Sequence, residues 1–509
     1  MSEVEQKSKA GQHAEPPKES SGFAKSVAML AGGSVIAQGL AILTAPIVAR
    51  LYAPEAFGLL AIYSSFVGIL AIISCWQYEQ AIMIAKDDRQ SANVFGLSML
   101  ILLVMTALAT LVTYFAGEKI LELVNASELK PLIWLLPVGM FTMGVAAPLR
   151  FWDTRHKRFG RLAKARVAQS ASQRTFVIGF GLAGFVSGGQ MIVFQLMGWL
   201  VTPLYLGAKL ISGDLKFILS NLNPASMKEA ARAYIKFPLF SSWMVLLNTV
   251  SQQIPIILLS AFFGAAIAGY YSNSVLLLQI PMVFVGQAIA QVFFQDAAAK
   301  HAEGQSLAPL VDSVYLRLNA IGMLPMMMVA VIGPELFSVF LGGRWYEAGV
   351  YSAILAPSLL VNFLFSPMSY LLSVLERQGT TLVIFIATFI LRVAALYAGY
   401  HFFNDARIAI IFFGVVNFLS YGFLAIFAYY LVKAPMIRPV ALCSRYFLYS
   451  APSLAAVAFC KWILELNHYA LLATAFVSAL PYFYLIIKTD PRLKEIFLKA
   501  FGKINGRIR

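Results

Sequence analysis

Two arginines, Arg174 and Arg392, interrupt stretches of sequence that are otherwise apolar. A charged side chain at the centre of a bilayer costs about 2.5–3.5 kcal/mol on insertion scales, so it generally serves a function. The guanidinium is a planar fork of donors that matches the oxygens of a phosphate. We predict that both arginines line a shared water-filled cavity and hold a pyrophosphate or an acidic sugar. The alternatives are that they snorkel to the membrane interface or bond backbone carbonyls.

Neutral amides accompany these charges in two other apolar stretches. Asn248 and Gln252 lie in one, and Gln287 and Gln291 lie in the next, spaced by four residues and so on one face of a helix. Amides in hydrocarbon must find hydrogen-bonding partners. They either hold helices together or bond sugar hydroxyls in a cavity, and the sequence leaves both readings open.

The elements that position these residues are membrane helices. The 509-residue chain is 60% hydrophobic and only 12% charged, whereas soluble domains carry about 25% charged residues. Its apolar stretches are about 20 residues long, enough for a helix to cross a ~30 Å hydrocarbon core. We predict an all-α polytopic membrane protein with about fourteen transmembrane helices. The predicted spans are 26–49, 56–77, 93–116, 132–149, 167–188, 189–208, 237–262, 266–294, 318–333, 348–374, 380–402, 408–431, 440–460 and 468–487.

The distribution of positive charge supports this count of spans. With fourteen spans, 31 of the 39 Lys and Arg residues fall on the side of the two termini. Positive residues collect in cytoplasmic loops, so both termini are predicted to be cytoplasmic. The net charge of +15 therefore reflects topology and does not indicate nucleic acid binding. The basic run between Arg155 and Arg166 is either a retention signal of this kind or a surface for anionic lipid headgroups.

An internal repeat connects the two arginines. The spacing from Pro148 to Gly160 recurs between Pro367 and Gly379, and a weaker match links the region after Pro46 to that after Pro255. The offset is about 210–220 residues in both places, and it makes Arg174 and Arg392 nearly equivalent. Duplicated halves are typical of transporters, whose substrate binds between the halves.

The repeat gives a predicted organisation of two six-helix lobes with pseudo-two-fold symmetry and two extra C-terminal helices. The predicted segments are a disordered cytoplasmic tail (1–24), an N-terminal lobe (25–208), a cytoplasmic linker (209–236), a C-terminal lobe (237–431), the two extra helices (432–488) and a basic cytoplasmic tail (489–509).

Other kinds of chemistry find little support in the sequence. The three cysteines, Cys75, Cys443 and Cys460, lie in apolar stretches without CxxC spacing, and the five histidines are scattered. No metal site and no P-loop is predicted, and no cofactor is expected. The longest predicted extracytoplasmic loops have about 15 residues, which is too short for a catalytic domain.

Several motifs resemble one family of membrane proteins. The stretch from Gly33 to Leu59, the Tyr78-Glu79-Gln80-Ala81-Ile82 segment, and the stretches 333–350 and 355–380 resemble Wzx-type polysaccharide repeat-unit flippases. That family belongs to a superfamily that includes multidrug exporters and the lipid II flippase. The resemblance covers roughly residues 25–430. It implies a two-lobed fold and an undecaprenyl-pyrophosphate-linked oligosaccharide as substrate.

The resemblance also bears on residue roles. Cationic residues in the family's central cavity are thought to meet the anionic substrate, which would suit Arg174 and Arg392. Arg50 and Glu79 fall in the matched motifs at opposite ends of two helices, so they are either gate residues or structural charges at helix ends.

We therefore expect a flippase for O-antigen, capsule or exopolysaccharide repeat units, working by alternating access. A cation-coupled multidrug exporter on the same fold, a membrane enzyme of glycan assembly and an adaptor for other polysaccharide-assembly proteins are the alternatives. Proton or sodium coupling is open, since the sequence shows no site for either ion.

Overall fold

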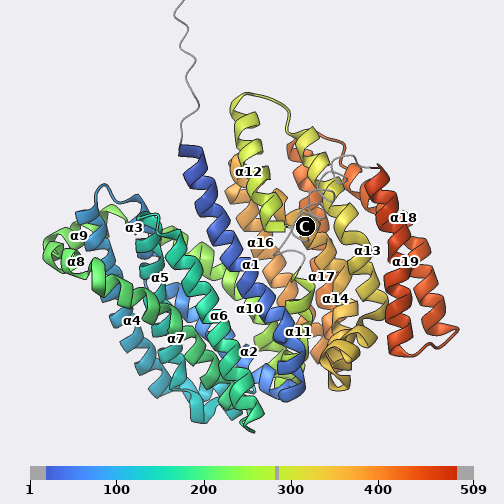
Figure 1. The fold of residues 1–509 in the computed structure, drawn as a ribbon, viewed down its shortest axis with the longest axis horizontal. Coiled ribbons are helices and arrows are strands. Elements are labelled where there is room, and N and C mark those ends of the chain that lie inside the picture. The colour runs from blue at the N-terminus through green and yellow to red at the C-terminus, as the bar shows by residue number, and fades with distance from the viewer. Residues whose placement is uncertain (1–18, 281–285, 490–509) are drawn as a thin grey trace, which may run out of the picture.

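The computed structural model describes residues 19–280 and 286–489, and within these ranges the chain is helical with no strand. Figure 1 shows the helices standing side by side in two groups. The first group comprises α1 (Glu19–Leu51), α2 (Pro54–Ile73), α3 (Ala81–Ile84), α4 (Asp88–Leu123), α5 (Leu135–Arg155), α6 (Phe159–Leu182), α7 (Gly188–Gly213), α8 (Leu215–Asn221) and α9 (Pro224–Ala233). The second comprises α10 (Ser242–Phe263), α11 (Ala265–Leu278), α12 (Gln287–Ala302), α13 (Ala308–Leu341), α14 (Tyr346–Phe365), α15 (Ser369–Val374), α16 (Gln378–Ala398), α17 (Ala406–Leu431), α18 (Arg438–Trp462) and α19 (His468–Thr489).

The described helices confirm a multi-pass membrane protein. Eleven of them are long and apolar enough to cross a membrane, and a helix occupies each of the fourteen predicted spans. The three spans outside the eleven are α6, α18, and the pair α11 and α12. The count of fourteen therefore stays a prediction.

Several helix boundaries differ from the predicted ones. Helix α1 begins at Glu19, so residues 19–24 are helical and do not belong to a disordered tail; residues 1–18 and 490–509 lie outside the described part. Helices α4 and α13 exceed their predicted spans at both ends, since hydropathy ends a span where charges begin although a helix continues into water. The predicted break after Phe263 is confirmed by Gly264, whose φ of +91° favours glycine.

The two groups of helices repeat one packing order. Helix α1 packs on α6 as α10 packs on α16, and α4 packs on α5 as α13 packs on α14. The pairs α2–α5, α5–α7 and α6–α7 likewise correspond to α11–α14, α14–α17 and α16–α17, whereas the counterparts of α2–α7 and α5–α6 make weaker contacts or none. This equivalence agrees with the internal repeat, and Figure 1 shows the two lobes on opposite sides of α1 and α10.

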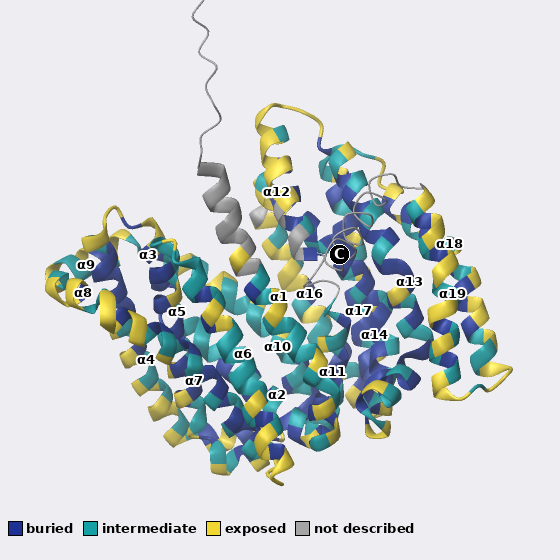
Figure 2. Ribbon diagram, viewed as in Figure 1, coloured by how far each residue is buried: buried dark blue, intermediate teal, exposed yellow. Residues whose placement is uncertain are grey.

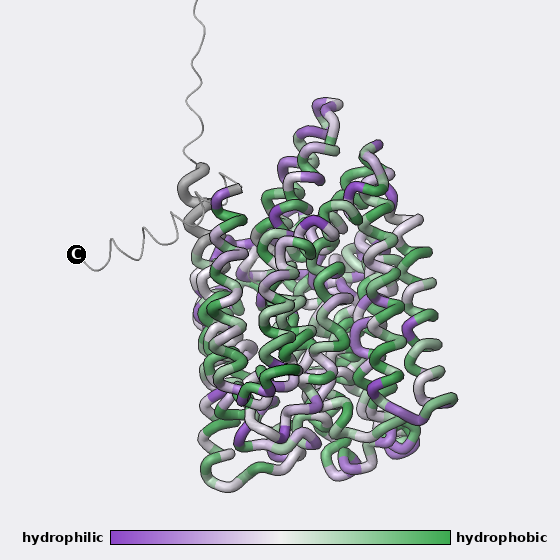
Figure 3. Tube along the Cα trace, turned by 90° about the vertical axis from the view of Figure 1, so that its right-hand side faces the viewer, coloured by the Kyte–Doolittle hydropathy of each residue, from purple (hydrophilic) through white to green (hydrophobic). Residues whose placement is uncertain are grey.

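The outer surface of the lobes is apolar over most of its height. Helix α4 alone exposes Leu103, Val104, Leu111 and Phe115, and exposed apolar patches of this extent mark a membrane-facing surface. Figure 2 shows the buried residues concentrated inside the bundle. In Figure 3 hydrophobic residues follow the length of the helices, while hydrophilic ones gather toward their ends.

The lobes meet closely at the end formed by the turns after α1, α10 and α13. A Cβ atom on Gly58 of α2 would lie 1.8 Å from the carbonyl oxygen of Ala265, and one on Gly269 of α11 would lie 2.0 Å from that of Pro54. The two backbones therefore touch directly. The Trp345 indole adds a hydrogen bond across the lobes, donated to the Ala49 carbonyl at 2.8 Å.

The predicted linker 209–236 is folded onto the N-terminal lobe. Helix α7 extends to Gly213, and α8 and α9 pack on α4. Asn93 of α4 donates to the Asn221 carbonyl and accepts from the Asn223 amide, both at 2.9 Å. The Tyr78 hydroxyl donates to the Ala231 carbonyl at 2.9 Å.

The basic run from Arg155 to Arg166 is partly structural. Arg155 donates to the carbonyls of Ile82 and Ala85 at the end of α3 and pairs with Asp88 at 3.0 Å. Arg158 pairs with Asp214, and this contact lowers the pKa of the Asp214 carboxyl. These two arginines are thus committed to protein partners, which leaves fewer charges in the run for lipid headgroups.

Two ion pairs attach α18 to the C-terminal lobe. Arg438 lies 2.9 Å from Asp312 near one end of the helix, and Lys461 lies 2.9 Å from Glu335 near the other. Lys461 and Glu335 are largely buried, and removing one partner of a buried pair costs about 3–5 kcal/mol. Helices α18 and α19 are therefore held firmly on the lobe that they extend.

The close contact between α2 and α11 makes a test of the fold. We expect Gly269→Ala to destabilise the protein by about 1–3 kcal/mol, because the added methyl group would overlap the Pro54 carbonyl. Thermal unfolding of the purified protein in detergent measures this change. The matched control is Gly207→Ala in α7, where a Cβ meets nothing within 4 Å and alanine favours the helix. Equal loss of stability in both variants would contradict the contact.

Candidate functional site

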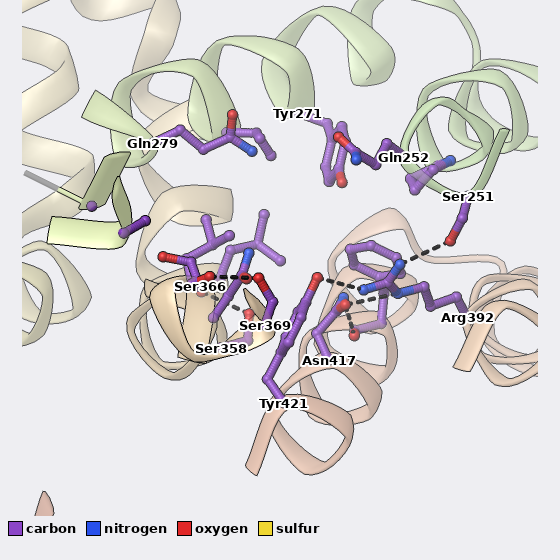
Figure 4. A pocket seen from close by; sticks show the side chains of 18 of the residues that line it. Ser251, Gln252, Tyr271, Gln279, Ser358, Ser366, Ser369, Arg392, Asn417 and Tyr421 are labelled. Carbon is purple, nitrogen blue, oxygen red and sulfur yellow. Dashed lines mark hydrogen bonds between the residues drawn. The ribbon is translucent and has the colours of Figure 1, made fainter. Parts of the chain in front are cut away.

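A polar chamber of about 590 Å³ lies inside the C-terminal lobe. Helices α10, α11, α12, α14, α16 and α17 contribute to its wall, together with the segment from Ser366 to Tyr370. Figure 4 shows hydroxyl and amide side chains pointing into this space from opposite sides. The hydroxyl and amide residues of the wall are Ser251, Gln252, Tyr271, Gln279, Ser358, Asn362, Ser366, Ser369, Tyr370, Asn417 and Tyr421. We call this space the first chamber.

Arg392 of α16 is the one charged residue among the described residues of this wall. Its Nε donates to Asn417 Oδ1 at 2.8 Å, Nη1 donates to Ser251 Oγ at 2.9 Å, and Nη2 donates to the Tyr421 hydroxyl at 3.0 Å. Its guanidinium carbon also lies 5.6 Å from the centre of the Tyr421 ring. All of these partners are neutral, so the positive charge is held in position but not compensated (Figure 4).

A second chamber of about 400 Å³ adjoins the first at Arg392. The two share Ser251, Gln252, Ser369, Arg392 and Tyr421. The second chamber is more apolar, and no Asp or Glu is found among its described lining residues. Its apolar wall consists of Met244, Val245, Leu247, Leu372, Leu382, Phe385 and Leu424. Arg392 therefore sits at the junction of a polar and an apolar space.

The structure brings several of the predicted binding residues together. Asn248 lines the second chamber and Gln252 lines both, and the Gln252 amide donates to Asn248 Oδ1 at 3.4 Å. Gln287 and Gln291 belong to α12, but their side chains lie outside the described part. Their neighbours Gly286 and Ala290 line the first chamber.

Sequence reasoning missed other residues that complete the site. Asn417 and Tyr421 hold Arg392 from α17, and Ser358, Asn362 and Ser366 line the first chamber from the α14 side. Asn417 gave a usable signal, because an amide inside the apolar span 408–431 requires a partner. Single serines and tyrosines in apolar helices are too common to give one.

Arg174 lines neither of these two chambers, so the shared cavity for both arginines stays a prediction. Every residue described for the two chambers belongs to the C-terminal lobe, and Arg174 lies in α6 of the other lobe. On its face of α6, Arg166 donates to Ser34 Oγ at 2.5 Å and Ser170 donates to the Ala37 carbonyl at 2.8 Å, so this face meets α1. The buried Nε of Arg174 has no hydrogen-bond partner among the described residues.

Arg50 and Glu79 lie at opposite ends of the bundle, as predicted. Arg50 donates to the Val339 carbonyl of α13 at 3.3 Å, so it crosses from one lobe to the other where the lobes meet. Glu79 lies in the short turn after α2, buried inside the N-terminal lobe. Burial raises the pKa of its carboxyl to about 7, against a smaller opposing effect of nearby Arg150. One carboxylate oxygen, Oε2, is buried without a hydrogen-bond partner among the described residues.

Comparison with known families identifies the chain. The model of the family described as "Polysaccharide biosynthesis protein" matches residues 47–350, which is more than half of the chain. The chain belongs to this family. The predicted resemblance, which covered roughly residues 25–430, is confirmed by this match.

Individual proteins and structures are similar to this family member. It is 23% identical over 378 residues to the succinoglycan biosynthesis transport protein ExoT of Rhizobium meliloti (strain 1021), covering 71% of each chain. Its fold matches lipid II flippase MurJ in an inward closed conformation with a TM-score of 0.71 at 11% identity, over 93% of this chain and 99% of that one. An inward-facing multidrug resistance MATE family transporter of the MOP superfamily matches with a TM-score of 0.63 at 16% identity, over 82% and 99% of the two chains. The two structural matches confirm the predicted all-helical, multi-pass membrane fold.

The buried carboxyl of Glu79 gives a prediction about pH. Because the folded protein raises this pKa from 4.5 to about 7, the folded state holds a proton that the unfolded chain releases. The stabilising effect of that proton is complete below about pH 4.5 and is lost as the pH rises through about 7. We expect Glu79→Gln to remove this part of the pH dependence, measured as the unfolding temperature between pH 5 and 8.

The matched control for this measurement is Glu128→Gln, which changes an exposed glutamate of the same lobe. It should leave the wild-type pH profile unaltered. A Glu79→Gln profile that runs parallel to the wild type across this range would contradict the buried, protonated carboxyl.

Proposed function

We propose that this protein is a flippase that moves undecaprenyl-pyrophosphate-linked oligosaccharide repeat units from the cytoplasmic to the periplasmic leaflet. The observation that carries the proposal is the uncompensated guanidinium of Arg392 in a chamber walled by hydroxyls and amides. Membership of the polysaccharide biosynthesis family supports it. The similarity to a succinoglycan transport protein favours exopolysaccharide over O-antigen or capsule as the product.

The chemistry of the substrate explains why such a chamber is needed. Each sugar hydroxyl left without a partner in hydrocarbon costs several kcal/mol, and a charged pyrophosphate costs far more. The first chamber offers donors and acceptors to hydroxyls, and Arg392 offers a charge to the phosphate. The lipid chain can remain in an apolar environment throughout, so the protein has to shelter only the polar part.

Movement between leaflets requires access from each side in turn. The lobes touch at one end through the α2–α11 backbones and the Trp345 and Arg50 contacts. Arg50 donates one hydrogen bond across the lobes there, which can break without leaving a carboxylate unpaired. We propose that separation of the lobes at this end opens the periplasmic side and that Arg50 belongs to this gate.

The orientation and the driving force follow from charge. Lys86, Arg89, Lys157 and Arg161 lie in or next to turns at the end of the bundle where α1 begins. Because positive residues collect in cytoplasmic loops, we propose that this face lies in the cytoplasm and that the protein is in the inner membrane. With a negative cell interior, outward movement of an anion is favoured by about 2.3 kcal/mol per charge per 100 mV. We propose that this potential sets the direction.

Substitution of Arg392 tests the proposal in cells. In a deletion strain, we expect Arg392→Gln to restore less than about a tenth of the wild-type surface polysaccharide, and undecaprenyl-linked repeat units to accumulate on the cytoplasmic leaflet. Arg392→Lys should restore an intermediate amount, since lysine keeps the charge but not the fork. Leaflet sidedness is measured with a membrane-impermeant glycosidase on intact and inverted vesicles.

The matched control is Arg445→Gln, which removes an exposed arginine of α18 outside both chambers. It should restore full polysaccharide. If the deletion leaves repeat units in the periplasm unpolymerised, the protein acts after flipping and the proposal is wrong.

A further inference from the structure

The two chambers differ in polarity, and Arg392 stands between them. We propose that they form a divided binding site for an isoprenyl pyrophosphate. The pyrophosphate lies at Arg392, the first isoprene units occupy the second chamber, and the glycan occupies the first. This inference rests on the proposed function and deepens it, because it assigns each part of the substrate to its own subsite within the C-terminal lobe.

The free donors of Arg392 support a phosphate at the junction. A guanidinium has five N–H donors, and Arg392 uses one on Nε, one on Nη1 and one on Nη2 for its three neutral partners. One N–H therefore remains on each terminal nitrogen. Donors on two neighbouring guanidinium nitrogens can pair with two oxygens of one phosphate. The three hydrogen bonds to Asn417, Ser251 and Tyr421 fix the guanidinium before the ligand arrives.

The second chamber suits a branched hydrocarbon chain. Leu247, Leu372, Leu382, Phe385 and Leu424 form most of its apolar wall. Its volume of about 400 Å³ lies within the ~300–1,000 Å³ of small-molecule sites. Met244 is 51% exposed and Phe385 is 38% exposed, so the wall reaches the surface of the lobe, where the rest of a long chain can continue into the bilayer.

The first chamber suits a large polar body. It is larger than the second, at about 590 Å³, and most of its wall residues bear a hydroxyl or an amide. A glycerophospholipid would place only a small headgroup there and would bring two acyl chains to the apolar side. A single isoprenoid chain that ends in a pyrophosphate-linked oligosaccharide fills both chambers, so we assign the site to that class of lipid.

Binding of short isoprenyl pyrophosphates to the purified full-length protein tests the assignment. The probes are inorganic pyrophosphate and geranyl, farnesyl and geranylgeranyl pyrophosphate, measured by isothermal titration calorimetry in detergent. Each added isoprene unit should tighten binding by about tenfold or more while the chamber still has room, because each buried CH₂ contributes about 0.8 kcal/mol. Arg392→Gln should weaken all four by at least tenfold and leave the binding of farnesol unchanged.

Two filling variants separate the chambers. Ser420→Phe adds a ring to the second chamber, and Asn362→Phe adds one to the first. Ser420→Phe should abolish the dependence on chain length and retain pyrophosphate binding. Asn362→Phe should leave farnesyl pyrophosphate binding unchanged and weaken a farnesyl-pyrophosphate-linked disaccharide at least tenfold. Unfolding temperatures confirm that each variant is folded, and Leu382→Asn replaces Ser420→Phe if that variant does not fold.

The outcomes distinguish this inference from the proposed function. Affinity that does not change with chain length, or equal competition by phosphatidylglycerol, overturns the divided site even if Arg392→Gln still blocks polysaccharide export. Chain-length dependence that Ser420→Phe removes supports the divided site. If such binding is found in a protein whose deletion leaves flipping intact, the divided site stands and the proposed function fails.

Discussion

Polar groups cannot be left without partners in hydrocarbon, and this constraint shapes every level of the structure. It makes the described chain helical, since only helices satisfy the backbone within a single segment. It also makes the hydroxyls of Ser65, Ser98, Thr142 and Ser274 donate to carbonyls four residues earlier in their own helices. The same cost favours an inward position of Arg392, where three side chains from other parts of the lobe accept its hydrogen bonds. A chamber with a largely polar wall therefore forms inside a lobe whose outer surface is apolar.

The sequence predicted those features that hydrophobicity and charge determine locally. Apolar length located a helix at each predicted span, Gly264 marked a true break, and Arg392 stood out because charge is rare in such stretches. The partners of Arg392 could not be predicted, since Ser251 is 141 residues away along the chain and nothing local connects the two. The folding of 209–236 onto the N-terminal lobe was missed for the same reason, because Asn93 and Tyr78 reach residues far ahead of them.

The repeat predicted the packing of the lobes better than it predicted the site. Helices pair in the same order in both lobes, yet the two nearly equivalent arginines have different surroundings. Arg392 faces two chambers and has three partners, whereas Arg174 lies on the α6 face that meets α1. Equivalent helix positions give equivalent backbone positions, but the size of neighbouring side chains decides whether a cavity remains. The two halves therefore share one packing order but differ in the surroundings of their equivalent arginines.

The attachment of α8 and α9 to the N-terminal lobe has a mechanical consequence. Tyr234 still reaches back to Gln90 at 3.1 Å, and the π-helical turn at Phe237–Ser241 already leads into α10. Only Ile235 and Lys236 connect Tyr234 to this turn. So short a connection keeps the two lobes together at this point, and it can act as the pivot about which they rotate. In the proposed cycle, the angle by which one lobe rotates relative to the other then determines whether a bulky glycan can pass. Because the helices extend far from the pivot, a small rotation there gives a wide opening at their other ends.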